Sequence, residues 1–136
     1  MFKTIRDELY TVVNALTAST DLAHVYNYEP KSLKDWYVSA TVSPIESIEN
    51  IFDTTTNLSL YPFEVSVFMP NDDPENNEWP FLILIDLILV ALRANETLSW
   101  NALWAIFRIR FGYTADESPL RVCRIQCIYQ ALNDVN

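Results

Sequence analysis

Two cysteines and a single histidine are the side chains best suited to nucleophilic or metal chemistry. Cys123 and Cys127 are four residues apart, a spacing that on a helix would place both thiols on one face, where they could hold a metal. The surrounding residues alternate between polar and apolar, so this segment is a predicted strand. Two thiols with the distant His24 also leave a tetrahedral ligand set incomplete. We therefore interpret both cysteines as buried, free thiols in a reducing compartment.

Catalytic chemistry finds little support elsewhere in the chain. His24 lies between Ala23 and Val25 in an apolar stretch, and no serine or cysteine motif accompanies it. The 136 residues include one glycine, whereas dinucleotide fingerprints, P-loops and nucleophile elbows each need several. We expect a protein that is not an enzyme and that has no cofactor and no metal site.

Acidic side chains gather in the segment 70–78, with the sequence PNDDPENNE. Its carboxylates belong to Asp72, Asp73, Glu75 and Glu78. They loosely resemble a calcium-binding loop, but the turn glycine and the closing pattern of an EF-hand are missing. We expect a solvated polar loop, with an electrostatic surface that matters to a partner as the alternative.

Charge is distributed unevenly along the chain, which has 9 basic and 18 acidic residues and a net charge of −9. Such a chain repels a phosphate backbone, so general DNA binding is not expected. Alternation predicts that Arg108, Arg110 and Arg124 cluster on the outward face of a C-terminal hairpin. This cluster would match an acidic surface on a second copy, and head-to-tail contacts of this kind can close a ring. A plain solvated face is the alternative.

The elements follow from periodicity along a chain of single-domain length. Apolar residues at helical spacing predict a helix over 2–18. Alternation of polar and apolar residues predicts strands over 24–28 and 36–43 and a hairpin over 46–69. Pro62 should break this hairpin or introduce a bulge. The dense apolar run 79–92 predicts a helix with Pro80 in its first turn, buried on most of its circumference. With Asp86 at its centre and about 14 residues, it is shorter than the roughly 18–20 of a membrane span. Two further strands, 104–113 and 120–132, form the terminal hairpin.

This order is α-β-β-β-β-α-β-β. It predicts an α+β fold, a single mixed or antiparallel β-sheet with two α-helices packed on one face, and one domain over residues 1–136.

The order of elements resembles that of the tail-terminator, or tail-completion, proteins of long-tailed bacteriophages, over nearly the whole chain. The resemblance lies in the segments MFKTIRDELYTVVNAL, HVYNYEP, SLYPFEVSVFMP, WPFLILIDLILVALRAN, AIFRIRFGY and VCRIQCIYQAL. It implies a structural virion protein of the head-tail neck, assembled in the host cytoplasm. Such a protein forms a ring, commonly of six subunits, that caps the tail tube, ends its polymerisation and docks onto the head-side connector.

The partners implied are other copies of the chain, the tail-tube protein and the connector, with no membrane. DNA would pass through the ring as cargo, without specific binding, and an acidic lumen would keep the phosphate backbone from adhering. Glu46 and Glu49, with the four acids of segment 70–78, are candidates for that lumen or for a ring face. Arg108, Arg110 and Arg124 are candidates for subunit contacts.

Two other classes stay open. Another neck component on the same axis, a head-completion or connector protein, has a similar order of elements. A small acidic inhibitor that mimics DNA would also be acidic, but it would be a monomer or dimer with carboxylates spaced like phosphates on one face.

Overall fold

The computed structural model describes residues 1–30, 38–45, 58–70, 73–99, 101–114 and 120–132. Its elements are α1 (Phe2–Asn14) with the 3₁₀ turn η1 (Ala15–Ala18), β1 (Leu22–Tyr26), β2 (Val38–Pro44), β3 (Leu58–Met69), α2 (Pro74–Ala94), β4 (Trp104–Tyr113) and β5 (Arg121–Leu132). The fold is α+β, as the sequence predicts. The predicted strand around residues 48–52, the first arm of the 46–69 hairpin, lies outside the described residues, as do Trp36 and Tyr37.

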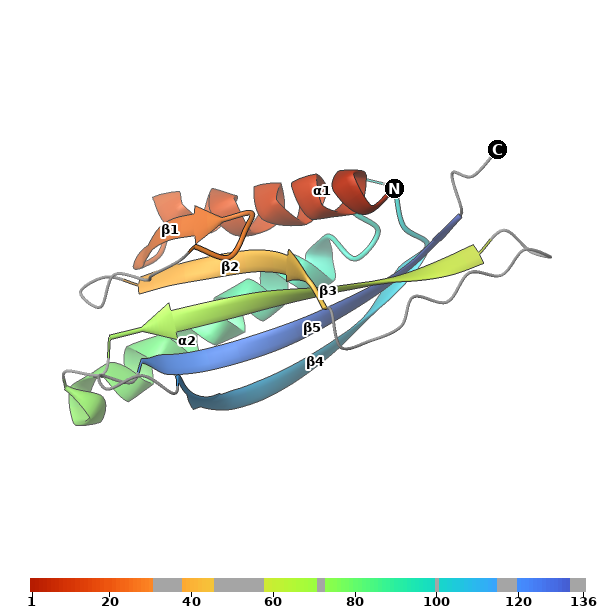
Figure 1. Ribbon diagram of the computed structural model, residues 1–136. Coiled ribbons are helices and arrows are strands. Elements are labelled where there is room, and N and C mark those ends of the chain that lie inside the picture. Colours follow the sequence, from red (N-terminus) through yellow and green to blue (C-terminus); the bar gives the residue numbers. More distant parts are fainter. Residues whose placement is uncertain (31–37, 46–57, 71–72, 100, 115–119, 133–136) are drawn as a thin grey trace.

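The described strands form one five-stranded sheet in the order β1-β2-β3-β5-β4. β1 pairs with β2 in parallel, and the other three pairings are antiparallel. Side chains alternate between two faces, so Val65 on β3 and Ile125 on β5 point toward the helices, while Glu64 and Gln126 point away. Figure 1 shows α1 lying along β1 and β2, with α2 behind β3 and β5. We call the helix-covered side the inner face and the other side the outer face.

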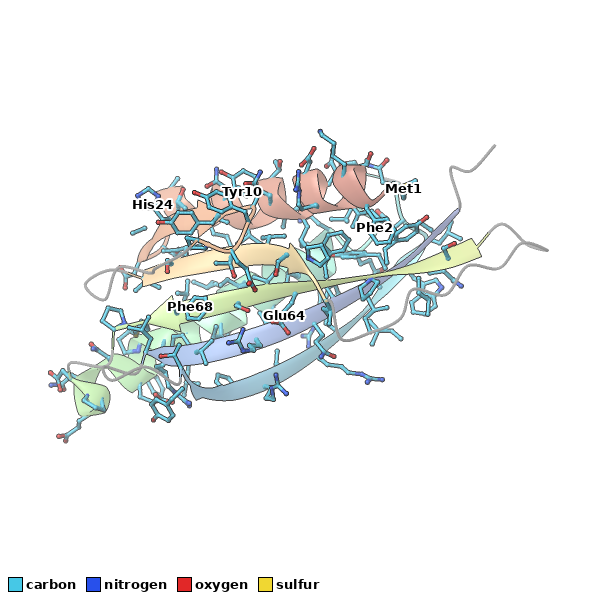
Figure 2. The ribbon with its side chains drawn as sticks, in the orientation of Figure 1. Met1, Phe2, Tyr10, His24, Glu64 and Phe68 are labelled. Atoms are coloured by element: carbon cyan, nitrogen blue, oxygen red, sulfur yellow. The ribbon has the colours of Figure 1, made fainter. Side chains whose placement is uncertain are left out.

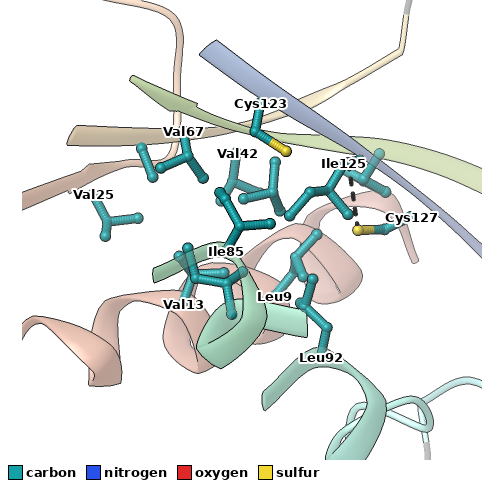
Figure 3. Packing of buried hydrophobic residues seen from close by; sticks show 14 of the residues in the cluster. Leu9, Val13, Val25, Val42, Val67, Ile85, Leu92, Cys123, Ile125 and Cys127 are labelled. Carbon is teal, nitrogen blue, oxygen red and sulfur yellow. Dashed lines mark hydrogen bonds between the residues drawn. The ribbon is translucent and has the colours of Figure 1, made fainter. Parts of the chain in front are cut away.

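The hydrophobic core lies between the inner face and the two helices (Figure 3). α1 buries Ile5, Leu9 and Val13, which recur every four residues and therefore share one side of the helix. The sheet contributes fully buried aromatic residues, among them Tyr61, Phe63 and Tyr129. Burying this apolar surface is the main driving force for the fold.

Pro62 does not break β3, contrary to the sequence prediction, because β3 and β5 stay in register through Pro62 and Ile128. The carbonyl of Pro62 accepts a hydrogen bond from the N–H of Ile45, just beyond the end of β2, at 3.1 Å. The nitrogen and the carbonyl of one strand residue point to the same side. The missing N–H of Pro62 therefore lies at the end of the β2–β3 ladder, one residue beyond its last pair, Pro44 with Phe63.

α2 begins at Pro74, six residues before the proline that the sequence analysis placed in its first turn. Pro74 is at the start of the helix, which Asp73 precedes, and the N–H of Asn77 bonds the Asp73 carbonyl at 2.9 Å. The prediction of a loop through residue 78 was wrong because this first part of the helix is polar and carries no apolar periodicity. Pro80 consequently lies inside the helix.

The exposed side of α2 is also wider than predicted. Phe81, Leu84, Ile85, Ile88 and Leu92 are buried. On the opposite side, four apolar residues follow one another at intervals of three or four: Trp79, Ile83, Leu87 and Val90, with exposed fractions of 72%, 44%, 45% and 63%. We call these four residues the α2 stripe.

Candidate functional site

The three predicted arginines meet on the outer face, at the edge of the sheet formed by β5 and β4. Arg110 is directly opposite Arg124, and Arg108 is opposite Gln126. Two like charges facing each other across a strand pair destabilise it. Glu64 on β3 offsets this repulsion, because its carboxylate lies 3.3 Å from the Arg124 guanidinium. Figure 2 shows Glu64 on this face of the sheet.

Arg124 is held firmly, whereas the other two arginines are exposed. In addition to Glu64, the Arg124 guanidinium donates to the Ser66 hydroxyl at 3.1 Å and lies 5.9 Å from the centre of the Phe68 ring. Arg108 and Arg110 have no hydrogen bond or ion pair among the residues that the structure describes. They are therefore the members of the cluster that are available to another molecule.

Two hollows flank these arginines. The larger, about 560 Å³, brings Arg110 and Arg124 together with Arg6 from α1 and with Tyr28 and Glu29, which follow β1. The smaller, about 160 Å³, is lined by Arg108, Arg110, Arg124, Glu64, Ile109 and Gln126. The larger hollow contains three arginines and two glutamates, Glu29 and Glu64. This mixture of charges suits a polar protein surface with its own carboxylates.

The predicted acidic residues are not brought together in the described part of the chain. Glu46, Glu49 and Asp72 lie outside it. Asp73 and Glu75 are exposed at the start of α2, and the Asp73 carboxylate accepts a hydrogen bond from the Asn76 side chain at 2.8 Å. Glu78 is bound within the subunit, because Arg121 donates two hydrogen bonds to its carboxylate at 2.9 and 3.1 Å.

Arg121 is a structural residue that the sequence analysis missed. It lies two residues before Cys123 and four before Ile125 on β5, so its side chain points to the same inner, apolar face of the sheet. A charged side chain on an apolar face needs partners. The alternation of residues along β5 was therefore the sequence signal that could have identified Arg121 as a paired residue. Besides Glu78, it bonds the Gly112 carbonyl and lies 4.9–5.9 Å from the ring centres of Phe81, Phe111 and Tyr113. The Glu78 carboxylate raises the pKa of the guanidinium further.

Both cysteines are free and buried on the inner face. Burial raises the pKa of Cys123 to about 11, and it raises the pKa of Cys127 further still. Thiols in this state are poor nucleophiles. His24 stacks against Tyr26 with ring centres 5.7 Å apart, and the described residues contain no group of three acid, cysteine or histidine side chains placed to hold a metal.

Exposed apolar side chains are numerous on two adjoining elements, which the sequence did not indicate. Among the described residues, 12 large hydrophobic side chains are exposed, and 10 of them lie on α2 or β4. On β4, Trp104 and Ile106 lie on the outer face with the arginines, whereas Ile109, Phe111 and Tyr113 lie on the inner face beside α2. Phe81 on α2 packs edge-on against Phe111 with ring centres 6.3 Å apart, so the two elements adjoin. In the part of the chain described, no helix has the length and apolar character needed to cross a bilayer.

Comparison with known proteins adds no family assignment. No protein-family model matches this sequence, and no curated protein matches it.

Proposed function

We propose that this chain is a self-assembling structural protein of the head-tail neck of a long-tailed bacteriophage, of the tail-terminator type. Copies associate in a ring, which we expect to be a hexamer, and the ring caps the tail tube, ends its polymerisation and docks onto the head-side connector. The proposal concerns a protein of the virion that uses no cofactor and performs no catalysis.

The observation that carries the proposal is the apolar surface on α2 and β4. Monomeric proteins rarely leave a large contiguous apolar patch in water, whereas interfaces between subunits are built from such patches. Here the exposed apolar residues are concentrated on one helix and on the two faces of the edge strand beside it. Self-association would bury them.

Charge supports the same conclusion. Arg108 and Arg110 are exposed cations on a chain with a net charge of −9, and the mixed-charge hollow beside Arg110 reaches across the outer face to residues that follow β1. Complementary charges on different parts of one subunit favour head-to-tail contacts, which close into rings when the rotation permits. The remaining acidic surface suits a channel through which DNA passes without adhering.

The DNA-mimic alternative fits the described carboxylates less well. A mimic presents rows of unpaired carboxylates on one face. Asp7 on α1, Glu64 on β3 and Glu78 on α2 are instead each paired with a basic side chain. Asp73 and Glu75 lie at the start of α2.

The proposal is tested by measuring the mass of the purified protein by light scattering over a range of protein and salt concentrations, together with negative-stain images. Polymerisation of the cognate tube protein in the presence of the chain supplies the functional readout. Rings with a central hole, and shorter tubes closed at one end, support the proposal. Rings that bind the connector but leave tube length unchanged would identify a connector protein instead. A strict monomer that neither caps nor binds tubes would overturn the proposal and favour the inhibitor class.

A further inference from the structure

Among the strands that the structure describes, β4 and β1 are the two edge strands of the sheet. β4 pairs only with β5, and β1 pairs only with β2, among the described strands. β4 is a long edge strand without proline or a register shift in its pairing with β5. Its two charged residues, Arg108 and Arg110, discourage pairing with a like-charged strand but leave its unpaired backbone groups open to an uncharged one.

Backbone geometry shows which groups β4 offers. Tyr113 is opposite Arg121, so Thr114 and Leu120 are the next opposite residues, and the N–H of Thr114 bonds the Leu120 carbonyl at 2.9 Å. Hydrogen-bonded and non-hydrogen-bonded pairs alternate along an antiparallel ladder. The N–H and carbonyl groups of Ile109 and Phe111 therefore point toward the free edge.

Strand directions make the two free edges compatible. β1 is parallel to β2, and each of the three pairings from β2 through β3 and β5 to β4 is antiparallel. Three reversals of direction make β4 antiparallel to β1. We propose that the β4 edge of one subunit pairs antiparallel with the β1 edge of the next copy, so that the sheets of neighbouring subunits are continuous. This inference rests on the proposed ring and assigns the interface within it.

Charge disfavours one register of the competing symmetric arrangement, in which β4 pairs with β4 of another copy. An antiparallel pair of β4 strands centred on Ile109 would place Arg108 of each copy opposite Arg110 of the other. Like charges in directly opposite positions destabilise a strand pair. On β1, the outer-face residues are His24 and Tyr26. Aromatic rings such as these stack well against guanidinium groups, so the outer faces of β4 and β1 are complementary.

The helices fit the same arrangement. α1 lies along β1 and β2 (Figure 1). α2 adjoins β4 through the contact of the Phe81 ring with the Phe111 ring. A continuous sheet therefore brings α1 of the next subunit to the flank of α2 that faces β4. Leu82, 39% exposed, lies on that flank, one turn beyond the Glu78 that binds Arg121. The pairing would thus cover part of the apolar surface on which the proposed function depends.

The first test compares two substitutions at one position. Ile109→Pro removes an N–H that points to the free edge and leaves the hydrogen bonds to β5 in place, whereas Ile109→Ala removes most of the side chain and keeps the N–H. We expect Ile109→Pro to lose the rings seen by light scattering and negative stain, and Ile109→Ala to retain them. Rings formed by a folded Ile109→Pro protein would overturn the strand pairing while leaving the proposed function intact.

The second test does not depend on tolerance of proline. Ala23→Cys on β1 and Ile109→Cys on β4 are combined and treated with a bis-maleimide cross-linker, because the native Cys123 and Cys127 are buried. We expect the double variant to give a ladder of species beyond the dimer, and each single variant to give none. Efficient dimers from Ile109→Cys alone would show β4 paired with β4 and overturn the inference. If the wild-type chain forms no rings and the double variant forms no ladder, the proposed function and the pairing both fail.

Discussion

Arg121 and Glu78 join the start of β5 to the first turns of α2 by a bidentate ion pair, with nitrogen to oxygen distances of 2.9 and 3.1 Å. The Arg121 side chain is 16% exposed and the Glu78 side chain 41% exposed. The three aromatic rings around the guanidinium keep it in place. This contact fixes the position of α2 relative to the β4–β5 edge, and hence the relation between the two parts of the apolar surface.

Arg121→Ala should lower the free energy of unfolding by about 2–3 kcal/mol, because it removes the ion pair, the bond to the Gly112 carbonyl and the ring contacts together. Arg121→Lys keeps the charge but loses the second hydrogen bond to Glu78, and should lower the free energy of unfolding by about 1 kcal/mol. Glu78→Gln should cost less than about 1 kcal/mol because the carboxylate is partly exposed. Urea unfolding curves give all three values. Wild-type stability in Arg121→Ala would show that the contact does not hold α2.

Arg110→Glu should impair assembly and leave the stability of the subunit nearly unchanged, because Arg110 is exposed and lies opposite another arginine. Lys3→Glu is the matched control, with the same change of charge on α1, where Lys3 has only an exposed pair with Asp7. Light scattering should show fewer rings for Arg110→Glu and normal rings for Lys3→Glu. Equal ring formation by both variants would remove Arg110 from the interface.

A double substitution on the α2 stripe, Ile83→Gln with Val90→Gln, should reduce assembly or docking without unfolding the subunit, since both residues are exposed at 44% and 63%. Ile85→Ala on the buried side of the same helix should instead cost about 2–5 kcal/mol of stability through a cavity in the core. Thermal unfolding together with light scattering separates the two effects. A large loss of stability in the stripe variant would mean that the stripe packs within the subunit.

Stability should decline at alkaline pH because of the buried thiols. An unfolded thiol has a pKa near 9.0, whereas burial raises the pKa of Cys123 to about 11 in the folded chain and that of Cys127 further. The folded state thus retains protons that the unfolded state loses. This stabilisation is complete below pH 9.0 and is lost as the pH rises toward 11, with a slope of up to about 1.4 kcal/mol per pH unit for each thiol.

Unfolding free energies measured between pH 8 and 11 check this expectation. Cys123→Ala should make the decline less steep, whatever its effect on stability at neutral pH. An unchanged slope would assign the decline to other groups. Ellman's reagent should also leave both thiols unmodified until the protein unfolds.

The α+β class and the alternation of the strands could be predicted from the amino-acid sequence. Periodicity depends only on neighbouring residues, so the inner face of β5 and the clustering of Arg108, Arg110 and Arg124 on the opposite face could be read from it. Prediction from periodicity failed where the local sequence signals were weak or contradictory. The polar first turn of α2 has no apolar periodicity, and a proline read as a strand breaker is tolerated at the end of the β2–β3 ladder.

Contacts between side chains that are distant in sequence became visible in the folded chain. The structure supplied the following relationships. It paired Arg124 with Glu64 and Arg121 with Glu78, and it left Arg108 and Arg110 exposed. It also left the α2 stripe uncovered, although the sequence predicts burial over most of that helix. The physical reason is that a periodic pattern gives the direction of a side chain relative to its own element, whereas burial and charge pairing depend on which other element lies there. The strand order, with β1 and β4 at opposite edges and antiparallel, belongs to the same category.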